Sequence, residues 1–128
     1  MILVDASVLI DALKGKDPKI ANLFATLPVA ICGVTLAEVL HGARDPGHYR
    51  NLENALSKFP WVAVDDSIWK PLANHLFLLR TNGITVPFQD VFLATVGIVN
   101  DLEVWARDKQ FPLIQTVLPA LKLFVEPP

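Results

Sequence analysis

Four acidic residues stand in surroundings that suit a metal-binding site. Asp5 closes the apolar run Ile2-Leu3-Val4, and Asp108 follows shortly after a later apolar run. Glu38 and Asp90 each lie among apolar neighbours, and no Lys or Arg stands at helical spacing from Asp90. Because an unpaired buried carboxylate is costly, this pattern indicates that the missing partner is a bound cation.

The residue types favour a hard divalent cation over zinc. Magnesium prefers oxygen ligands and needs only a few carboxylates, since it keeps several waters, and manganese suits similar ligands. The chain has no cysteine cluster and no histidine pair at zinc-ligand spacing. We therefore expect Asp5, Asp90 and Asp108 to bind Mg²⁺ or Mn²⁺ directly. Glu38 is expected to bind the ion directly or through water. Surface or partly buried structural roles are predicted for the scattered histidines, His41, His48 and His75.

Such a site predicts catalytic hydrolysis of a phosphodiester. A bound metal can lower the pKa of its water and supply hydroxide at neutral pH. In-line displacement of the 3′ oxygen would then leave a 5′ phosphate. Ser7 could orient a metal ligand or a metal-bound water, and it could equally cap the helix expected after Asp5.

Each acid also has a local structural explanation, and these alternatives stay open. Asp5 could accept hydrogen bonds from the start of the next helix. Glu38 completes the capping-box pattern Thr35-x-x-Glu38. Asp90 lies in the first turn of its expected helix, where a negative charge interacts well with the helix dipole. Asp108 could cap the turn that it forms with its two neighbours. None of these explanations accounts for all four acids together.

The bulk composition indicates a compact protein without a general attraction to polyanions. Hydrophobic residues make up 52% of the 128, and the formal net charge is −2. This charge argues against a simple nucleic-acid binder, but not against a nuclease whose acids are offset by metal. The lone Cys32 excludes an intramolecular disulfide. With no signal-peptide pattern and no unbroken membrane-spanning run, we expect a cytoplasmic protein that does not bind membranes.

Short apolar runs alternate with helical patterns along the whole chain. This alternation predicts one α/β domain over residues 1–128, with a central parallel sheet and helices on both faces, a three-layer α/β/α arrangement. Ligands bind such sheets beyond the carboxyl ends of the strands, where Asp5 and Asp108 stand. Strands are predicted over 2–4, 29–32, 61–64, 103–106 and 121–125, and helices over 8–13, 17–27, 35–42, 65–82 and 88–99, with one more ending at Leu56.

At these acids the chain resembles the PIN-domain family, with motifs in the family's order over nearly the whole sequence. The opening Met1-Ile2-Leu3-Val4-Asp5-Ala6-Ser7 looks like the family's first motif, a strand ending in Asp with Ser or Thr two residues on. The other three motifs are resembled by Thr35–Ala43 around Glu38, by Asp90–Ala94, and by Trp105–Phe111 around Asp108. Among PIN domains, the VapC-like toxins of toxin–antitoxin modules are the group most similar to this chain.

This resemblance implies a PIN-like fold and a Mg²⁺- or Mn²⁺-dependent endoribonuclease that cleaves structured RNA such as tRNA or rRNA. It also implies a homodimer and inhibition by a VapB-like antitoxin, whose C-terminal segment covers the acids. Two positions depart from the family pattern. Ala106 stands where Thr or Ser is frequent, and Gln110 stands where a further Asp is frequent.

Arg107 and Lys109 flank Asp108 and are the preferred candidates for contacts with RNA phosphates. The basic residues Lys14, Lys16, Arg44 and Arg50 are further candidates, with ordinary solvated surface as the alternative for each.

Two other functions remain as alternatives to the nuclease. One is a catalytically weak or inactive PIN fold that acts only by binding protein or RNA, suggested by Ala106 and Gln110. The other is a receiver-like phosphoacceptor domain, suggested by Val64-Asp65-Asp66 after an expected strand. The receiver would need paired acids after the first strand, whereas Ala6 follows Asp5.

Overall fold

The computed structural model describes all 128 residues, as four short strands and seven α-helices with one 3₁₀ helix. In chain order the strands are β1 (Ile2–Val4), β2 (Val29–Ala30), β3 (Glu103–Trp105) and β4 (Lys122–Leu123). The helices are α1 (Ala6–Leu13), α2 (Pro18–Thr26), α3 (Gly33–His41), α4 (Pro46–Leu56), η1 (Asp66–Ile68), α5 (Trp69–Thr81), α6 (Phe88–Val99) and α7 (Gln110–Val117).

The strands form one parallel sheet in the order β2-β1-β3-β4. The chain moves from β1 to one neighbour, β2, and later returns to the other side of β1 as β3. The strand order therefore reverses between β1 and β3, and a crevice is expected beyond their carboxyl ends. The backbone N–H of Asp5 donates to the carbonyl of Trp105 at 2.8 Å, so the ends of these two strands are directly tied together.

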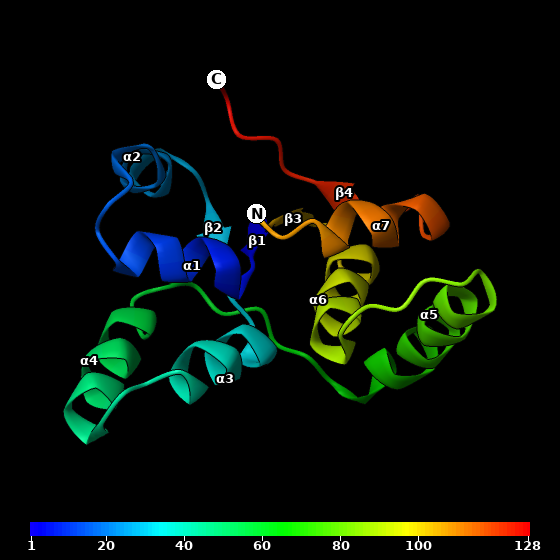
Figure 1. Ribbon diagram of the computed structural model, residues 1–128, viewed down its shortest axis with the longest axis horizontal. Coiled ribbons are helices and arrows are strands. Elements are labelled where there is room, and N and C mark those ends of the chain that lie inside the picture. The colour runs from blue at the N-terminus through cyan, green and yellow to red at the C-terminus, as the bar shows by residue number, and fades with distance from the viewer.

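Helices cover both faces of the sheet, as the alternating sequence predicted. Figure 1 shows α1, α2 and α4 on one side of the strands and α5, α6 and α7 on the other. Within β1, Ile2 and Val4 belong to the apolar cluster on the α1–α4 side, whereas Leu3 belongs to the cluster on the α5–α7 side. This alternation follows from the period of two in a strand, and burial on both faces explains why β1 has no polar residue.

Two segments differ in local structure from the sequence prediction. No helix was predicted over 110–117, where α7 lies. The expected strand over 61–64 is reduced to a single parallel bridge between Ile31 and Trp61. Trp61 is accordingly 55% exposed, while Trp105 and Cys32 are fully buried. No helix is long and apolar enough to span a membrane.

Candidate metal centre

The four predicted acids come from four separate segments at the carboxyl edge of the sheet. Asp5 follows β1, and Asp108 follows β3. Glu38 lies in the second turn of α3, and Asp90 lies in the first turn of α6. Asp5 is 4% exposed and Asp90 is 5% exposed, which is rare for carboxylates.

Asp5 is held by the start of α1, for which it is the N-cap. Its Oδ2 accepts hydrogen bonds from the Ser7 backbone N–H at 3.1 Å and from the Ser7 hydroxyl at 2.6 Å. The alternative that Ser7 caps this helix is therefore wrong, and the local explanation of Asp5 is confirmed. The Ser7 Oγ also accepts from the backbone N–H of Arg107 at 3.0 Å, so this hydroxyl links Asp5 to the segment that carries Asp108.

The capping box expected for Glu38 does not form. The helix begins two residues earlier than predicted, at Gly33, with Cys32 as its N-cap. Thr35 is buried inside this helix, and its hydroxyl donates to the carbonyl of Val4 at 3.3 Å. The Oε1 of Glu38 is buried and has no hydrogen-bond partner. Capping therefore gives no reason for a carboxylate at this position.

Asp90 is likewise without a partner, because its Oδ2 is buried and makes no hydrogen bond. Burial, followed by the nearby charges of Asp5, Asp108 and Glu38, raises the pKa of Asp90 to about 7. Its place in the first turn of α6 fits the helix-dipole explanation, but that effect lowers the energy of a charge and does not supply a hydrogen bond.

The acids are close enough to act on one another electrostatically. Burial and then the charges of Asp5 and Asp108 raise the pKa of Glu38. Burial likewise raises the pKa of Asp5, with a smaller contribution from Asp108. The Oδ1 of Asp108 accepts from the Gln110 N–H at 2.9 Å, one residue beyond the turn of Asp108 and its two neighbours for which the sequence suggested a cap. The four acids therefore influence one another, and their joint binding of a metal ion stays a prediction.

The four carboxylates are the ligand type that a hard divalent cation prefers, although they do not form a complete coordination site. No three acidic, imidazole or thiol groups converge tightly enough to hold an ion among them. Mg²⁺ does not need such a cage, because it binds through one or two carboxylates and keeps several waters. The unpaired oxygens of Glu38 and Asp90 are of the required hard type and lack any other partner. These two side chains are therefore suited to metal ligation.

Known proteins similar to this chain carry VapC and VapBC names. No established family profile matches the chain. Ribonuclease VapC1 of Methanocaldococcus jannaschii is 27% identical over 109 residues, which cover 85% of this chain and 76% of that protein. A chain of the DNA-bound VapBC from Salmonella typhimurium matches with a TM-score of 0.83 at 22% identity, over 96% of each chain. A chain of VapBC2 from Rickettsia felis matches with a TM-score of 0.82 at 18% identity, over 97% of this chain and 98% of that one.

The chain has the fold of these VapBC chains. The α/β fold predicted from the sequence is confirmed, because these structures match almost end to end. Within this VapC-like fold, Ala106 and Gln110 still depart from the motif around the fourth acid. Gln110 begins α7, and its backbone rather than its side chain contacts Asp108.

Arg107 has ion-pair partners that the sequence did not indicate. Its guanidinium lies 2.7 Å from Asp17, 3.1 Å from Asp11 and 2.8 Å from Glu126. The guanidinium is therefore paired with carboxylates of this chain and is not free to bind a phosphate. These ion pairs give no support to the predicted contact between Arg107 and RNA. Lys109 has no ion pair, and its RNA contact stays a prediction.

Two of the scattered histidines and Asp65 make hydrogen bonds within the chain. His75 Nδ1 lies 2.8 Å from the hydroxyl of the buried Thr95, and His48 Nδ1 accepts from the Arg44 backbone N–H at 3.0 Å. Asp65 is exposed and caps η1 through Ser67, so it does not stand at a strand end as the receiver-like alternative requires.

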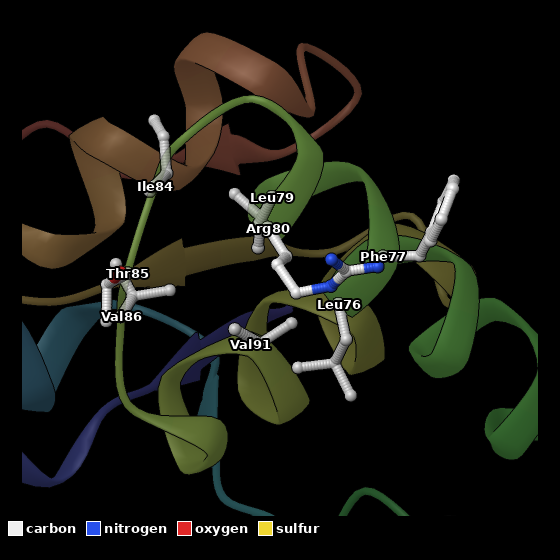
Figure 2. Close-up of a pocket in the computed structure, with 8 residues that line it drawn as sticks. All are labelled: Leu76, Phe77, Leu79, Arg80, Ile84, Thr85, Val86 and Val91. Atoms are coloured by element: carbon white, nitrogen blue, oxygen red, sulfur yellow. The ribbon is translucent and has the colours of Figure 1, made fainter.

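A separate pocket of about 520 Å³ is lined by none of the four acids. Figure 2 shows it between α5, the segment 84–86 and α6, with Leu76, Arg80 and Val91 among the side chains around it. Six of its eight lining residues are hydrophobic, and none is acidic. It therefore offers no groups for metal or phosphodiester chemistry, and the candidate site remains the carboxyl edge of the sheet.

Proposed function

We propose that this chain is a Mg²⁺- or Mn²⁺-dependent endoribonuclease and the toxin of a VapBC-type module. One observation carries the proposal: two buried carboxylate oxygens, on Glu38 and Asp90, have no partner and lie in one electrostatic group with Asp5 and Asp108. Such a group is stable at neutral pH when a cation offsets its charge. The ribonuclease name of the 27% identical relative supports RNA as the substrate.

Each side chain has a distinct part in this proposal. Asp90 and Glu38 would hold the cation through their unpaired oxygens, together with Asp5 and Asp108. Ser7 fixes the carboxylate of Asp5 through its hydroxyl and joins it to the backbone of Arg107. When bound, Mg²⁺ or Mn²⁺ would supply a water of lowered pKa and offset the charge of the attacked phosphate.

The proposal includes the partners expected for such a toxin. The similar structures are of VapBC assemblies, which supports a VapB-like antitoxin as the inhibitor of this chain. A homodimer and a cytoplasmic location belong to the same proposal. Trp69 and Phe88 are more than half exposed, and both pack against Phe92 at 6.1 and 6.3 Å between ring centroids, so a second copy would have apolar surface to cover.

The experiment is cleavage of labelled total RNA by purified, antitoxin-free protein with Mg²⁺ or Mn²⁺. Discrete fragments with 5′ phosphates are expected, and EDTA, Asp5→Asn and Asp90→Asn should each abolish them. Asp66→Asn, on the exposed η1, is the matched control and should cleave as the wild type does. Intact RNA at every metal concentration, from folded protein, would contradict the proposal.

The binding-only alternative keeps one specific observation in its favour. Ala106 and Gln110 replace polar side chains that are frequent near the fourth acid of PIN domains. A folded protein that binds RNA or antitoxin but never cleaves RNA would support this alternative. Restoring Ala106→Thr and Gln110→Asp together would then be expected to produce cleavage.

A further inference from the structure

A cavity adjoins the acidic site and shares one of its residues. It has a volume of about 590 Å³ and lies between α1, α3 and α4. Glu38 lines it, so the cavity continues directly from the group of acids. Its apolar lining comes from Ile10, Leu13, Val39 and Leu52, and its polar lining includes Lys14, Arg44, His48 and Asn51.

A second cavity continues from the first, because Arg44 lines both. It has a volume of about 500 Å³ and lies between the end of α3 and the start of α4. Its lining includes Arg50, His41 and Tyr49, and Tyr49 is 41% exposed. The two cavities together, here called the α3–α4 groove, run from Glu38 past Arg44 to Arg50.

The cations of the α3–α4 groove are not neutralised by the protein. Lys14, Arg44 and Arg50 make no ion pair, whereas Arg107 is paired with three carboxylates. Asp45 is the one acid in the second cavity, and its Oδ1 is engaged by the His48 N–H at 2.8 Å as the N-cap of α4. The lining thus has three cations, Lys14, Arg44 and Arg50, against two acids, Glu38 and Asp45, a positive balance on a chain whose net charge is −2.

His48 adds a donor to this surface. Its Nδ1 accepts the Arg44 backbone N–H, so the neutral ring carries its proton on Nε2. The groove thus combines cations and a donor for phosphate oxygens with apolar and tyrosine surface for bases. This combination is typical of proteins that bind single-stranded nucleic acid.

We propose that the α3–α4 groove binds single-stranded RNA on one side of the phosphate that is cleaved. This inference rests on the proposed ribonuclease function and adds the path of the substrate away from the acids. Unpaired cations favour a polyanion, and the shared residue Glu38 makes the path continuous with the site of chemistry. Single-stranded nucleotides fit because their bases are free to lie on apolar and aromatic surface.

The test is binding of a fluorescein-labelled, mixed-sequence single-stranded RNA 12-mer, measured by anisotropy in EDTA. Removing metal prevents cleavage and separates groove binding from the reaction. Arg44→Ala and Lys14→Ala should each weaken binding several-fold and reduce the slope of log K against log salt by about 0.7. Arg44→Lys should restore most of that slope. Arg80→Ala, which lies at the separate pocket on α5, should bind as the wild type does.

The outcomes distinguish this inference from the proposed function. If Arg44→Ala weakens RNA binding but the wild type cleaves no RNA with Mn²⁺, the groove holds and the ribonuclease proposal fails. The groove proposal is wrong if the wild type cleaves RNA but Arg44→Ala and Lys14→Ala have the same RNA affinity and the same salt dependence of binding as Arg80→Ala. The groove proposal would also be overturned if the wild type did not bind RNA. The same holds if Arg44→Ala and Lys14→Ala weakened binding of a VapB-like antitoxin but not binding of RNA.

Discussion

At the scale of single residues, the proposed chemistry depends on carboxylates that the protein itself does not neutralise. Asp5 and Asp108 each accept hydrogen bonds from the backbone that follows them. Glu38 and Asp90 have one buried oxygen each without any partner. A fold seldom leaves such atoms unpaired, so their presence at one edge of the sheet indicates a site rather than a structural device.

Asp90→Asn should stabilise the metal-free protein at high pH. The folded-state pKa of about 7 lies above the ordinary value of 3.8, so the folded protein binds this proton more tightly than the unfolded chain does. Stability from this group is full below about pH 4 and is lost as pH rises through 7. In EDTA at pH 8, Asp90→Asn should therefore raise the free energy of unfolding by about 2 kcal/mol.

Urea unfolding at pH 5 and pH 8 measures this effect, with Glu53→Gln on the exposed side of α4 as the control. The gain of Asp90→Asn should be smaller at pH 5, and the control should show none at either pH. A loss of stability at pH 8 would mean that the Asp90 carboxylate is satisfied in the fold, which would remove the argument for a missing cation.

At the scale of elements, the acids are positioned by close contact between α6 and the central strands. Gly97 of α6 faces Val104 of β3, and a Cβ at this glycine would lie 2.6 Å from the Val104 Cγ2. The absence of a side chain lets α6 approach the sheet, and α6 carries Asp90 at its other end. The Leu102 N–H donates to the Gly97 carbonyl at 2.8 Å, which fixes the same contact.

Gly97→Ala should destabilise the protein by about 1 to 3 kcal/mol, because α6 or β3 must shift to admit the methyl group. Thermal unfolding of Gly97→Ala and Gly42→Ala makes the comparison. Gly42 ends α3, and a Cβ there meets only the Val39 carbonyl at 3.6 Å, so its variant should be close to neutral. Equal melting temperatures for the two variants would show that the α6–β3 contact is looser than described.

The C-terminal segment is attached to the sheet through Glu126. Its carboxylate accepts from the indole Nε1 of Trp105 at 3.0 Å and from the Arg107 guanidinium at 2.8 and 2.9 Å. These interactions hold the pKa of Glu126 well below its usual range. The chain following β3, which carries Asp108, is thereby joined to the end of the molecule.

Glu126→Ala should lower the free energy of unfolding by about 1 to 2 kcal/mol at pH 7, because the Trp105 indole loses its acceptor and a partly exposed ion pair is lost. A lowered pKa gives stability that is present above pH 4.5 and lost as pH falls, so the difference from wild type should shrink toward pH 3. Denaturant unfolding of Glu126→Ala between pH 7 and pH 3 measures this effect, with Glu53→Ala as the control. Equal free energies of unfolding for the two variants at each pH would contradict the prediction.

Elements could be predicted from the sequence where local signals were strong. Helix α2, predicted over 17–27, spans Pro18–Thr26, with Asp17 as its N-cap. The helix at 110–117 was missed, although Pro112 in a first turn is compatible with a helix, since no intrahelical partner is required there. In the segment 61–64 only Trp61 forms a β-bridge, with Ile31. The extent of strand pairing depends on tertiary packing, and the local sequence pattern carries no information about it.

At the scale of the whole molecule, sequence reasoning predicted that the acids gather, because parallel strands end at one edge. Asp5 and Asp108 are 103 residues apart by number, and the charge of Asp108 still contributes to the raised pKa of Asp5. The partners of Arg107 could not be predicted, since Asp11, Asp17 and Glu126 meet it only after folding. Lys14, Arg44 and Arg50 were candidates for phosphate contacts from the sequence, but their gathering in the α3–α4 groove could not be predicted, because they come from separate segments.

The central claim is that the group of Asp5, Glu38, Asp90 and Asp108 binds a divalent cation. Electron paramagnetic resonance of Mn²⁺ titrated into the antitoxin-free protein tests it most directly, because free and bound ion are counted separately. The account predicts saturable binding by the wild type, its loss in Asp90→Asn and Asp5→Asn, and unchanged binding in Asp66→Asn. A wild type that binds no Mn²⁺ at millimolar concentration, or an Asp90→Asn variant that binds as well as the wild type, would contradict it.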